Sequence, residues 1–165
     1  MSKDSDNSNW EDPKWFREQP RTFWDPSRKL IKTIRDYQKL AKSSTPFAKI
    51  LKKQCVLRHR FWSVVTGAEV DLNCEIGGGF LMPHPNGIVI HPKAKIGVNC
   101  LIFQQVTLAG EVTLGYHVDV GAGAKLLGPI EVGNNVQVGA NAVVNRDVGS
   151  DVTVVGIPAK EVKKP

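Results

Sequence analysis

The fold is decided by residues 90–144, which read IHPKAKIGVNCLIFQQVTLAGEVTLGYHVDVGAGAKLLGPIEVGNNVQVGANAVV. This stretch repeats every six residues, and every sixth position carries an aliphatic side chain. These ten positions are Ile90, Ile96, Ile102, Leu108, Leu114, Val120, Leu126, Val132, Val138 and Val144. The fourth residue after each of them is small or β-branched. Those residues are Ala94, Cys100, Val106, Val112, Val118, Ala124, Ile130, Val136, Ala142 and Val148.

A period of six matches neither an α-helix, whose side chains repeat near 3.6 residues, nor an isolated strand, whose side chains alternate. It is typical of short strands that are joined by turns and wound into a solenoid. The aliphatic residue then points inward from each flat side, and a small residue packs beside each corner. Glycine often follows the aliphatic residue, as at Gly97, Gly115 and Gly121, and relieves strain at sharp turns. Stacked coils satisfy each other's backbone amides.

The composition excludes several classes of protein. The chain has 165 residues, of which 41% are hydrophobic and 23% charged, which is enough apolar material for a packed core. No apolar run approaches the roughly 20 residues of a membrane span. The N-terminus is polar and shows no secretory signal. Three cysteines lack CxxC and zinc spacing, so we expect reduced, buried thiols in a cytoplasmic protein without a metal site.

The charge divides the chain into two parts. The net charge is +6, and residues 1–65 carry +8 whereas residues 66–165 carry −2. All four tryptophans precede residue 66, and 14 of the 15 glycines lie from Gly77 to Gly156. We therefore predict a polar tail plus a helical hairpin cap over residues 1–65 and the repeat domain over residues 66–165.

The N-terminal part contains two signals for a helix start. Residues 1–12 are polar, and we expect them to be mobile. Asp25-Pro26 and Ser43-Ser44-Thr45-Pro46 each offer an N-cap followed by proline, and apolar residues follow at helical spacing. A basic hairpin could bind nucleic acid or an anionic membrane surface. We favour a solvated charged face over a hydrophobic cap, because no nucleic-acid-binding motif accompanies the charge.

The step of six is interrupted before Ile90. Eight residues instead of six separate Met82 from Ile90, so a turn must bulge within Pro83-His84-Pro85-Asn86-Gly87. The two prolines stiffen this turn and fix the direction of the histidine. A rigidly presented imidazole that titrates near neutral pH suits a general base, although a histidine in a proline-rich turn can equally be structural.

Four blocks of the sequence resemble the serine O-acetyltransferases, within the hexapeptide-repeat acyltransferases. They are FLMPHPNGIVIHPKAKIG (80–97), QQVTLAG (104–110), GAGAKLLG (121–128) and VGIPAK (155–160), and the match covers about residues 66–162. The resemblance implies a left-handed parallel β-helix of about five coils, preceded by a short helical segment. It further implies a homotrimer with active sites between subunits, and transfer of acetyl from acetyl-CoA to a hydroxyl group.

The resemblance also implies roles for particular residues. His84 matches the histidine that deprotonates the acceptor hydroxyl. Glu69 lies fifteen residues earlier, where the family has the carboxylate that orients this imidazole; Asp71 is the second candidate. Backbone N–H groups near Ala109 and Gly110 would stabilise the oxyanion. The residues expected to bind the cofactor are Ala109, Gly110, Gly121, Ala122, Ala124, Gly139, Ala140, Lys160, Lys163 and Lys164.

The remaining histidines and cysteines carry weaker signals. We expect His91 to be structural, His117 to lie at the surface beside Tyr116, and His59 to be exposed between two arginines. Cys74 and Cys100 occupy packing positions of the repeat, so neither is expected to act as a nucleophile.

Three departures from the family leave the acceptor open. Leu108 to Leu114 keeps the period of six, so the family's extruded loop with its Arg-His pair is missing, and Glu111 falls near the expected histidine. Pro83 replaces the aspartate that usually precedes the catalytic histidine. The C-terminus lacks the isoleucine that docks into cysteine synthase, so that complex is not expected.

We favour L-serine as the small-molecule acceptor, with a sugar or another hydroxylated acceptor as the alternative, and a non-catalytic scaffold as the third possibility. Neither nucleic-acid binding nor integral membrane insertion is expected.

Overall fold

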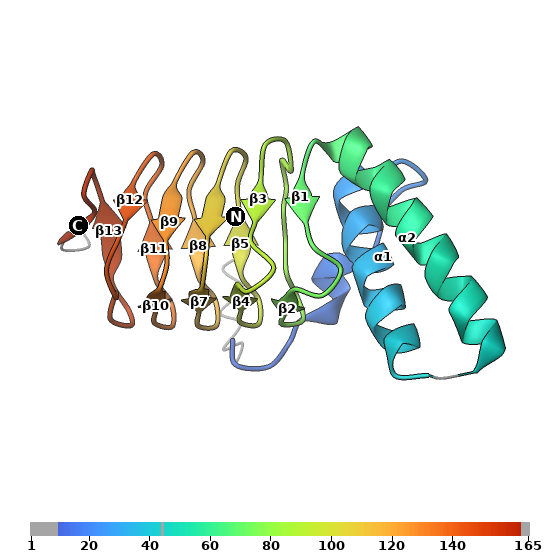
Figure 1. Cartoon of the computed structure of the whole chain (residues 1–165). Helices are drawn as coiled ribbons and strands as arrows, with labels where there is room; N and C mark the ends of the chain where they lie inside the picture. The colour runs from blue at the N-terminus through green and yellow to red at the C-terminus, as the bar shows by residue number, and fades with distance from the viewer. Residues whose placement is uncertain (1–9, 44, 163–165) are drawn as a thin grey trace, which may run out of the picture.

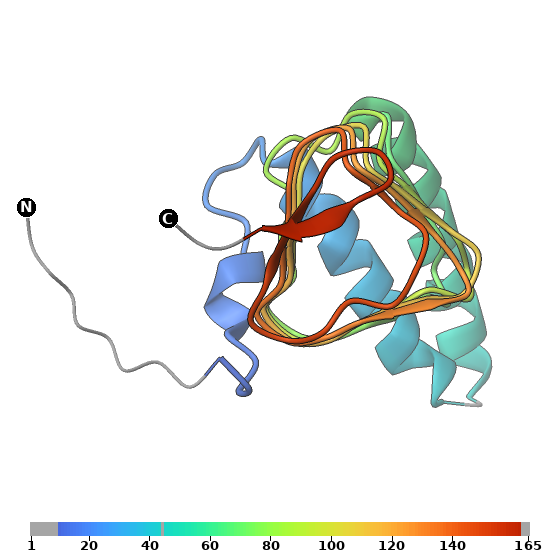
Figure 2. The same cartoon turned by 90° about the vertical axis from the view of Figure 1, so that its left-hand side faces the viewer.

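The computed structural model describes residues 10–43 and 45–162, and the chain forms a triangular solenoid closed at one end by two helices (Figures 1 and 2). Most of the expected polar tail, residues 1–9, lies outside the described residues. The strands are β1 (Glu69–Val70), β2 (Glu75–Ile76), β3 (Val89–Ile90), β4 (Lys95–Ile96), β5 (Leu101–Ile102), β6 (Thr107–Ala109), β7 (Val112–Leu114), β8 (Asp119–Val120), β9 (Lys125–Leu127), β10 (Ile130–Val132), β11 (Gln137–Val138), β12 (Val143–Val144), β13 (Thr153–Val155) and β14 (Lys160–Val162).

These strands form three sheets, one on each side of the triangle. The first sheet has the order β1-β3-β6-β9-β12, the second β2-β4-β7-β10, and the third β5-β8-β11-β13-β14. All neighbouring strands are parallel except β14, which turns back antiparallel to β13. The predicted left-handed parallel β-helix is therefore confirmed.

The period of six fixes the core as expected. The ten aliphatic positions from Ile90 to Val144 are all buried, and their side chains fill the interior of the triangle. The small residues at the fourth positions are buried too, with Cys100 and Ala124 completely inaccessible. A residue between two buried positions of one strand points outward, as Thr113 does between Val112 and Leu114.

The register of the strands locates the bulge. Val89 of β3 pairs with Thr107 of β6, eighteen residues later, as three hexads require. Glu69 of β1 pairs with Val89, twenty residues later. The two additional residues are accommodated in the turn before β3, which contains His84. The predicted break in the repeat is thus present as a local bulge. The step of eighteen residues then continues as far as β11, after which Gln137 pairs with Thr153, sixteen residues later.

Two helices cover the N-terminal end of the solenoid. The helix α1 (Pro26–Ala41) buries Leu30, Ile31 and Ile34 in the same cluster as the solenoid interior, so it seals the open end of the core. The helix α2 (Pro46–Thr66) starts at Thr45, whose side chain accepts a hydrogen bond from the Ala48 N–H, and ends at a left-handed glycine. Neither helix among the described residues is long and apolar enough to cross a membrane. The division into domains at residue 65 stays a prediction.

The segment before α1 runs along the solenoid. It includes the short 3₁₀ helix η1 (Trp15–Glu18). The buried side chain of Asn99 donates to the carbonyl oxygens of Trp10 and Asp12 at 2.8 and 2.7 Å and accepts from the Lys14 N–H at 2.8 Å. Residues 10–12, which we predicted to be mobile, are therefore held against a corner of the solenoid.

Candidate active site

The turn that carries His84 lies at the corner between the third and the first sheet. Leu81 before it bridges to Leu101 on the third sheet, and β3 after it belongs to the first sheet. The turn is held at both ends, because the Ser27 hydroxyl of α1 donates to the Met82 carbonyl and the Gly87 N–H donates to the Gly67 carbonyl at 2.8 Å. The His84 side chain is exposed, so a fixed backbone presents an accessible imidazole to solvent.

The predicted partner, Glu69, projects outward from β1. Its strand is hydrogen-bonded to the segment that follows the His84 turn, with the Glu69 N–H donating to the Ile88 carbonyl at 2.8 Å. Within the described chain, no hydrogen bond or ion pair joins His84 to Glu69. The second candidate, Asp71, has a structural role, because its carboxylate accepts from the backbone and side-chain N–H groups of Asn73 at 2.8 and 3.0 Å. The pairing of Glu69 with His84 stays a prediction.

A hollow of about 850 Å³ lies between α2 and the first sheet. It is lined by His59, Arg60, Ser63, Val64, Glu69, Val70, Asp71, Val89, Ile90, His91, Pro92, Thr107, Leu108, Ala109 and Gly110. The structure therefore brings Glu69 together with Ala109 and Gly110, which the sequence assigned to the carboxylate and to the oxyanion. His84 is not among the lining residues. The hollow combines an apolar floor with ionisable side chains at its rim, as small-molecule sites commonly do.

Two residues that line this hollow, His59 and Arg60, were not expected at the site. His59 was expected to be exposed, but it is half-buried and its Nε2 donates to the Val70 carbonyl at 2.8 Å. This bond ties α2 to β1 beside Glu69. Arg60 follows it and is exposed at the rim. The repeat pattern could not identify either residue, because both lie on the helix before the repeat begins.

The glycines and alanines expected to bind the cofactor lie mainly along the corner that also carries His84. Gly121 and Ala122 follow β8, and Gly139 and Ala140 follow β11, so the two pairs stack one coil apart. Backbone bonds link successive coils at this corner, for example from Asn141 N–H to the Ala122 carbonyl at 2.8 Å. The line of small residues leaves the backbone of the corner accessible, as an elongated ligand would require.

Other predicted contacts fit less well. Ala124 is completely buried, its N–H donates to Gly121, and its carbonyl accepts from Thr107, so it packs in the interior and has no group facing outward. Lys160 is exposed on β14 at the far end of the solenoid. Lys163 and Lys164 lie outside the described residues. One buried polar atom was not anticipated: the Gln104 side-chain oxygen, on the His84 corner, accepts no hydrogen bond from the described part of the chain.

The cysteines are packing residues. All three are free and buried. Burial raises the pKa of the Cys74 thiol to about 11 and that of Cys100 to about 12, so neither forms a thiolate near neutral pH. The prediction that neither acts as a nucleophile agrees with this, and an imidazole is the better candidate for reactive chemistry.

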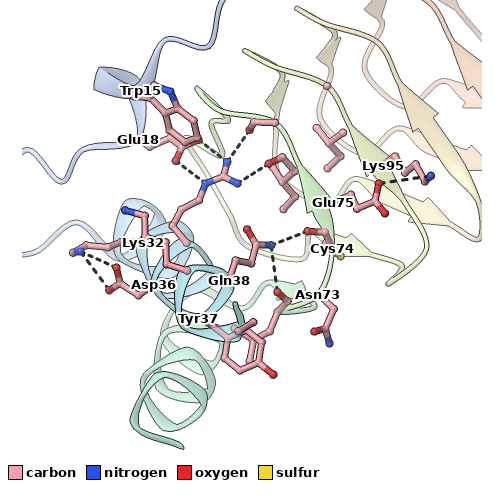
Figure 3. A pocket seen from close by; sticks show the side chains of 18 of the residues that line it. Trp15, Glu18, Lys32, Asp36, Tyr37, Gln38, Asn73, Cys74, Glu75 and Lys95 are labelled. Carbon is pink, nitrogen blue, oxygen red and sulfur yellow. Dashed lines mark hydrogen bonds and ion pairs between the residues drawn. The ribbon is translucent and has the colours of Figure 1, made fainter. Parts of the chain in front are cut away.

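A larger hollow of about 970 Å³ lies between η1, α1 and the second sheet (Figure 3). Six of its eight charged side chains form ion pairs with one another: Arg35 with Glu18, Lys32 with Asp36, and Lys95 with Glu75. Arg35 donates to both oxygens of Glu18 and to the carbonyls of Ile76 and Gly77. Because this network fastens α1 and η1 to the solenoid and includes none of the predicted site residues, the hollow beside Glu69 is the better candidate.

No family model matches the chain. A serine acetyltransferase of Synechococcus elongatus is 46% identical over 105 residues, which cover 59% of this chain and 43% of that protein. A serine acetyltransferase of Helicobacter pylori is 43% identical over 108 residues, covering 61% of this chain and 63% of that protein. A solved serine acetyltransferase in complex with CoA superposes with a TM-score of 0.71 at 31% identity, over 84% of this chain and 57% of that one.

The resemblance to serine acetyltransferases is confirmed. A further solved structure, the Neisseria gonorrhoeae serine acetyltransferase in complex with serine, has a TM-score of 0.70 at 28% identity and covers 85% of this chain and 58% of that one. The chain spans about half the length of the curated serine acetyltransferases that it matches.

The turn between β6 and β7 is tight, and it stands where serine acetyltransferases have the loop with the Arg-His pair. Gly110 adopts a left-handed conformation with φ of 82°, and its carbonyl accepts from the Val112 N–H at 3.0 Å. Glu111, near the expected position of the histidine, pairs with Lys93 at 2.7 Å, and this hydrogen bond lowers the pKa of its carboxyl group. The described turn therefore has a carboxylate–ammonium pair where the family has a cationic pair.

Proposed function

We propose that the chain is an acetyl-CoA-dependent O-acetyltransferase whose acceptor is the hydroxyl group of L-serine. The observation that carries the proposal is the fixed, solvent-exposed imidazole of His84, at a bulge of a solenoid that is similar to those of serine acetyltransferases. Two of the similar structures are complexes with CoA and with serine, which supports these two substrates.

The proposed reaction is a direct transfer. The neutral imidazole of His84 takes the hydroxyl proton as the oxygen attacks the thioester carbonyl, which forms a tetrahedral oxyanion. The oxyanion collapses, the carbon–sulfur bond breaks, and the imidazolium returns the proton to the leaving CoA thiolate. The products are the acetyl ester and CoA, and no acyl-enzyme forms, in keeping with the buried cysteines.

Two further groups assist in this scheme. The Glu69 carboxylate orients the imidazole of His84 and stabilises its positive charge in the transition state, as the acid of a Ser-His-Asp triad does. The Gly110 N–H donates no hydrogen bond within the described chain and is thus available to the oxyanion.

A homotrimer with sites between subunits belongs to the proposal. His84 and the pairs Gly121-Ala122 and Gly139-Ala140 lie at the corner before the first sheet. Ala109 and Gly110 lie at the end of β6, beside the corner after this sheet. If the solenoids pack side by side in a trimer, the corner that carries His84 in one subunit would lie near the corner that carries Gly110 in its neighbour. The pantetheine arm would follow the small residues, and Lys160 would meet the CoA phosphates. Reduced cysteines agree with a cytoplasmic location.

The second candidate acceptor is a sugar or another uncharged hydroxyl compound. One observation favours it: beside the tight turn at Gly110 the Lys93 ammonium is paired with Glu111. The described turn therefore offers no unpaired cation where serine acetyltransferases carry the Arg-His pair that holds the serine carboxylate. The two acceptors share the same base and the same donor.

An acceptor panel tests the proposal. The protein is incubated with acetyl-CoA and L-serine, or with single sugars and nucleotide sugars, and the product is identified by mass spectrometry. We expect O-acetylserine as the main product. A sugar ester alone would replace serine by the second candidate, and CoA release without any acceptor would contradict both.

A matched pair of variants tests the carboxylate. Glu69→Gln is expected to lower kcat about tenfold or more, because the His84 imidazolium loses its counter-charge in the transition state. The KM for acetyl-CoA is expected to change little. Glu131→Gln changes an exposed carboxylate on another sheet and is expected to have no effect. Equal rates for the two variants would remove Glu69 from the mechanism.

A further inference from the structure

The outer face of α2 carries an uncovered apolar stripe. Five large side chains along this helix are each between 54% and 84% exposed. They are Phe47, Ile50, Leu57, Phe61 and Val64. Figure 1 shows α2 outside α1, at the end of the molecule that is farthest from the C-terminus. We expected the exposed face of the hairpin to be charged and solvated, so this stripe needs an explanation of its own.

The stripe is continuous along the helix. With about 100° between successive residues of an α-helix, its five members fall within an arc of about 100° and extend over about 26 Å. The residues that α2 buries, Ala48, Cys55 and Thr66, lie on the opposite side and face the rest of the chain. The helix is therefore apolar on two opposite sides, of which the fold covers only one.

The charges beside the stripe have a single sign. Residues 46–66 contain five lysines and arginines and no aspartate or glutamate. Arg58 is paired with Asp36 at 3.5 Å, and Lys52 donates to the carbonyl oxygens of Ala41 and Ser43, at the end of α1 and in the loop that follows it. Lys49, Lys53 and Arg60 follow one edge of the stripe and have no ion-pair partner in the part of the chain that is described. An apolar stripe bordered by unpaired cations is thus complementary to an apolar surface that carries negative charge.

Aromatic side chains enlarge the stripe at the C-terminal end of α2. Trp62 makes edge contacts with Phe61 at 4.9 Å and with Trp24 at 5.7 Å between ring centroids. Trp24 is 61% exposed and the neighbouring Phe23 is exposed as well. The Lys29 ammonium lies over the Trp62 ring at 5.5 Å. Tryptophan with nearby lysine is typical of the boundary between lipid headgroups and acyl chains.

We propose that α2 lies on an anionic lipid surface, with its apolar stripe at the level of the headgroups and Lys49, Lys53 and Arg60 against lipid phosphates. A second copy of α2 is a poorer occupant. An antiparallel pair would bring these cations against their equivalents, and a parallel pair would offer them no carboxylate, because residues 46–66 contain none. Nucleic acid would use the cations but leave the apolar stripe in water.

Vesicle sedimentation tests the proposal on the full chain. Vesicles contain phosphatidylglycerol and phosphatidylcholine in equal parts, or phosphatidylcholine alone. We expect binding to the anionic vesicles that weakens as salt is added, and at least tenfold weaker binding to the neutral ones. The paired change Leu57→Glu with Phe61→Glu is expected to abolish binding. The control Phe16→Glu changes a 74% exposed phenylalanine of η1 and is expected to leave binding unchanged, because η1 and α2 lie on different sides of the solenoid (Figure 2).

A charge variant separates lipid binding from apolar adsorption. Lys49→Gln with Lys53→Gln is expected to weaken binding to anionic vesicles about tenfold or more and to reduce its salt dependence, since each cation near such a surface contributes roughly fivefold. Lys39→Gln, at an exposed lysine of α1, is expected to have no such effect. Circular dichroism checks that each variant is folded.

Two results would overturn the proposal. Binding that is equal for both kinds of vesicle, or absent from both, would exclude an anionic lipid surface. If light scattering instead shows that Leu57→Glu with Phe61→Glu dissociates an oligomer while no vesicle binds, the stripe is an interface between copies of this chain.

Discussion

Replacing Asn99 by glycine should detach the N-terminal segment from the solenoid. Asn99 is completely buried, and its side chain makes three hydrogen bonds to backbone groups 85 to 89 residues away. Its φ of 62° is left-handed, a conformation that glycine adopts without strain. The change therefore removes the three bonds and leaves the turn intact.

The magnitude follows from these bonds. At about 1 kcal/mol net for each, Asn99→Gly should lower the free energy of unfolding by about 3 kcal/mol. Asn99→Ala should lose about 1 kcal/mol more, because a Cβ in the left-handed region is strained. Trp10 stacks on His117 at 3.9 Å in the wild type, so its fluorescence should also change on detachment.

Urea unfolding at a fixed protein concentration measures these differences. Asn141→Gly is the matched control, because Asn141 has a similar φ of 56° in an equivalent turn but an exposed side chain. It should stay within about 0.5 kcal/mol of the wild type. If Asn99→Gly were as stable as Asn141→Gly, the reasoning that these bonds hold the segment would be refuted.

Two further predictions concern the packing of the coils. A Cβ on Gly97 would lie 2.2 Å from the Gly115 carbonyl oxygen of the next coil, so Gly97→Ala should lower the free energy of unfolding by about 3 kcal/mol. A Cβ on Gly149 meets nothing within 4 Å, so Gly149→Ala should leave thermal unfolding unchanged. Cys74 and Cys100 should resist alkylation at pH 8 in the folded protein and react in urea. Rapid labelling of the folded protein would contradict their burial. Because the pKa values of these thiols are about 11 and 12 in the folded protein, the thiols of the unfolded chain ionise first as the pH rises. The free energy of unfolding should therefore fall as the pH rises above about 9.

Much of the fold could be predicted because its signal is local and repeated. The aliphatic residues at every sixth position set the inward direction of each strand, and the step of eight between Met82 and Ile90 located the bulge before β3. The starts of both helices followed from Asp25-Pro26 and Thr45-Pro46. Each of these features depends on residues close together in the sequence, where spacing reports geometry directly.

The contacts between distant segments could not be predicted in this way. Asn99 looks like any turn residue of the repeat, and only the fold shows that residues 10–14 bond to it. His59 lies on a helix without a repeat, so its bond to the Val70 carbonyl has no sequence signal. The same holds for the exposed stripe of α2, because helical spacing identifies an apolar face but not whether another element covers it.

For the site, the sequence indicated the residues but not their grouping. The bulge singled out His84, and the resemblance to serine acetyltransferases gave Glu69, Ala109 and Gly110 their expected roles. The structure groups the last three in one hollow and holds His84 at the neighbouring corner. The contact of His84 with Glu69 stays a prediction that kinetics must test.

The most direct test of the proposed chemistry is the initial rate of CoA thiol formation from acetyl-CoA and L-serine, for the wild type and for His84→Asn. The account predicts a serine-dependent rate in the wild type that falls by roughly a thousandfold in the variant, as expected when a general base is removed. A serine-dependent rate that survives in His84→Asn would contradict the account, and a wild type that forms no CoA with serine would exclude serine as the acceptor.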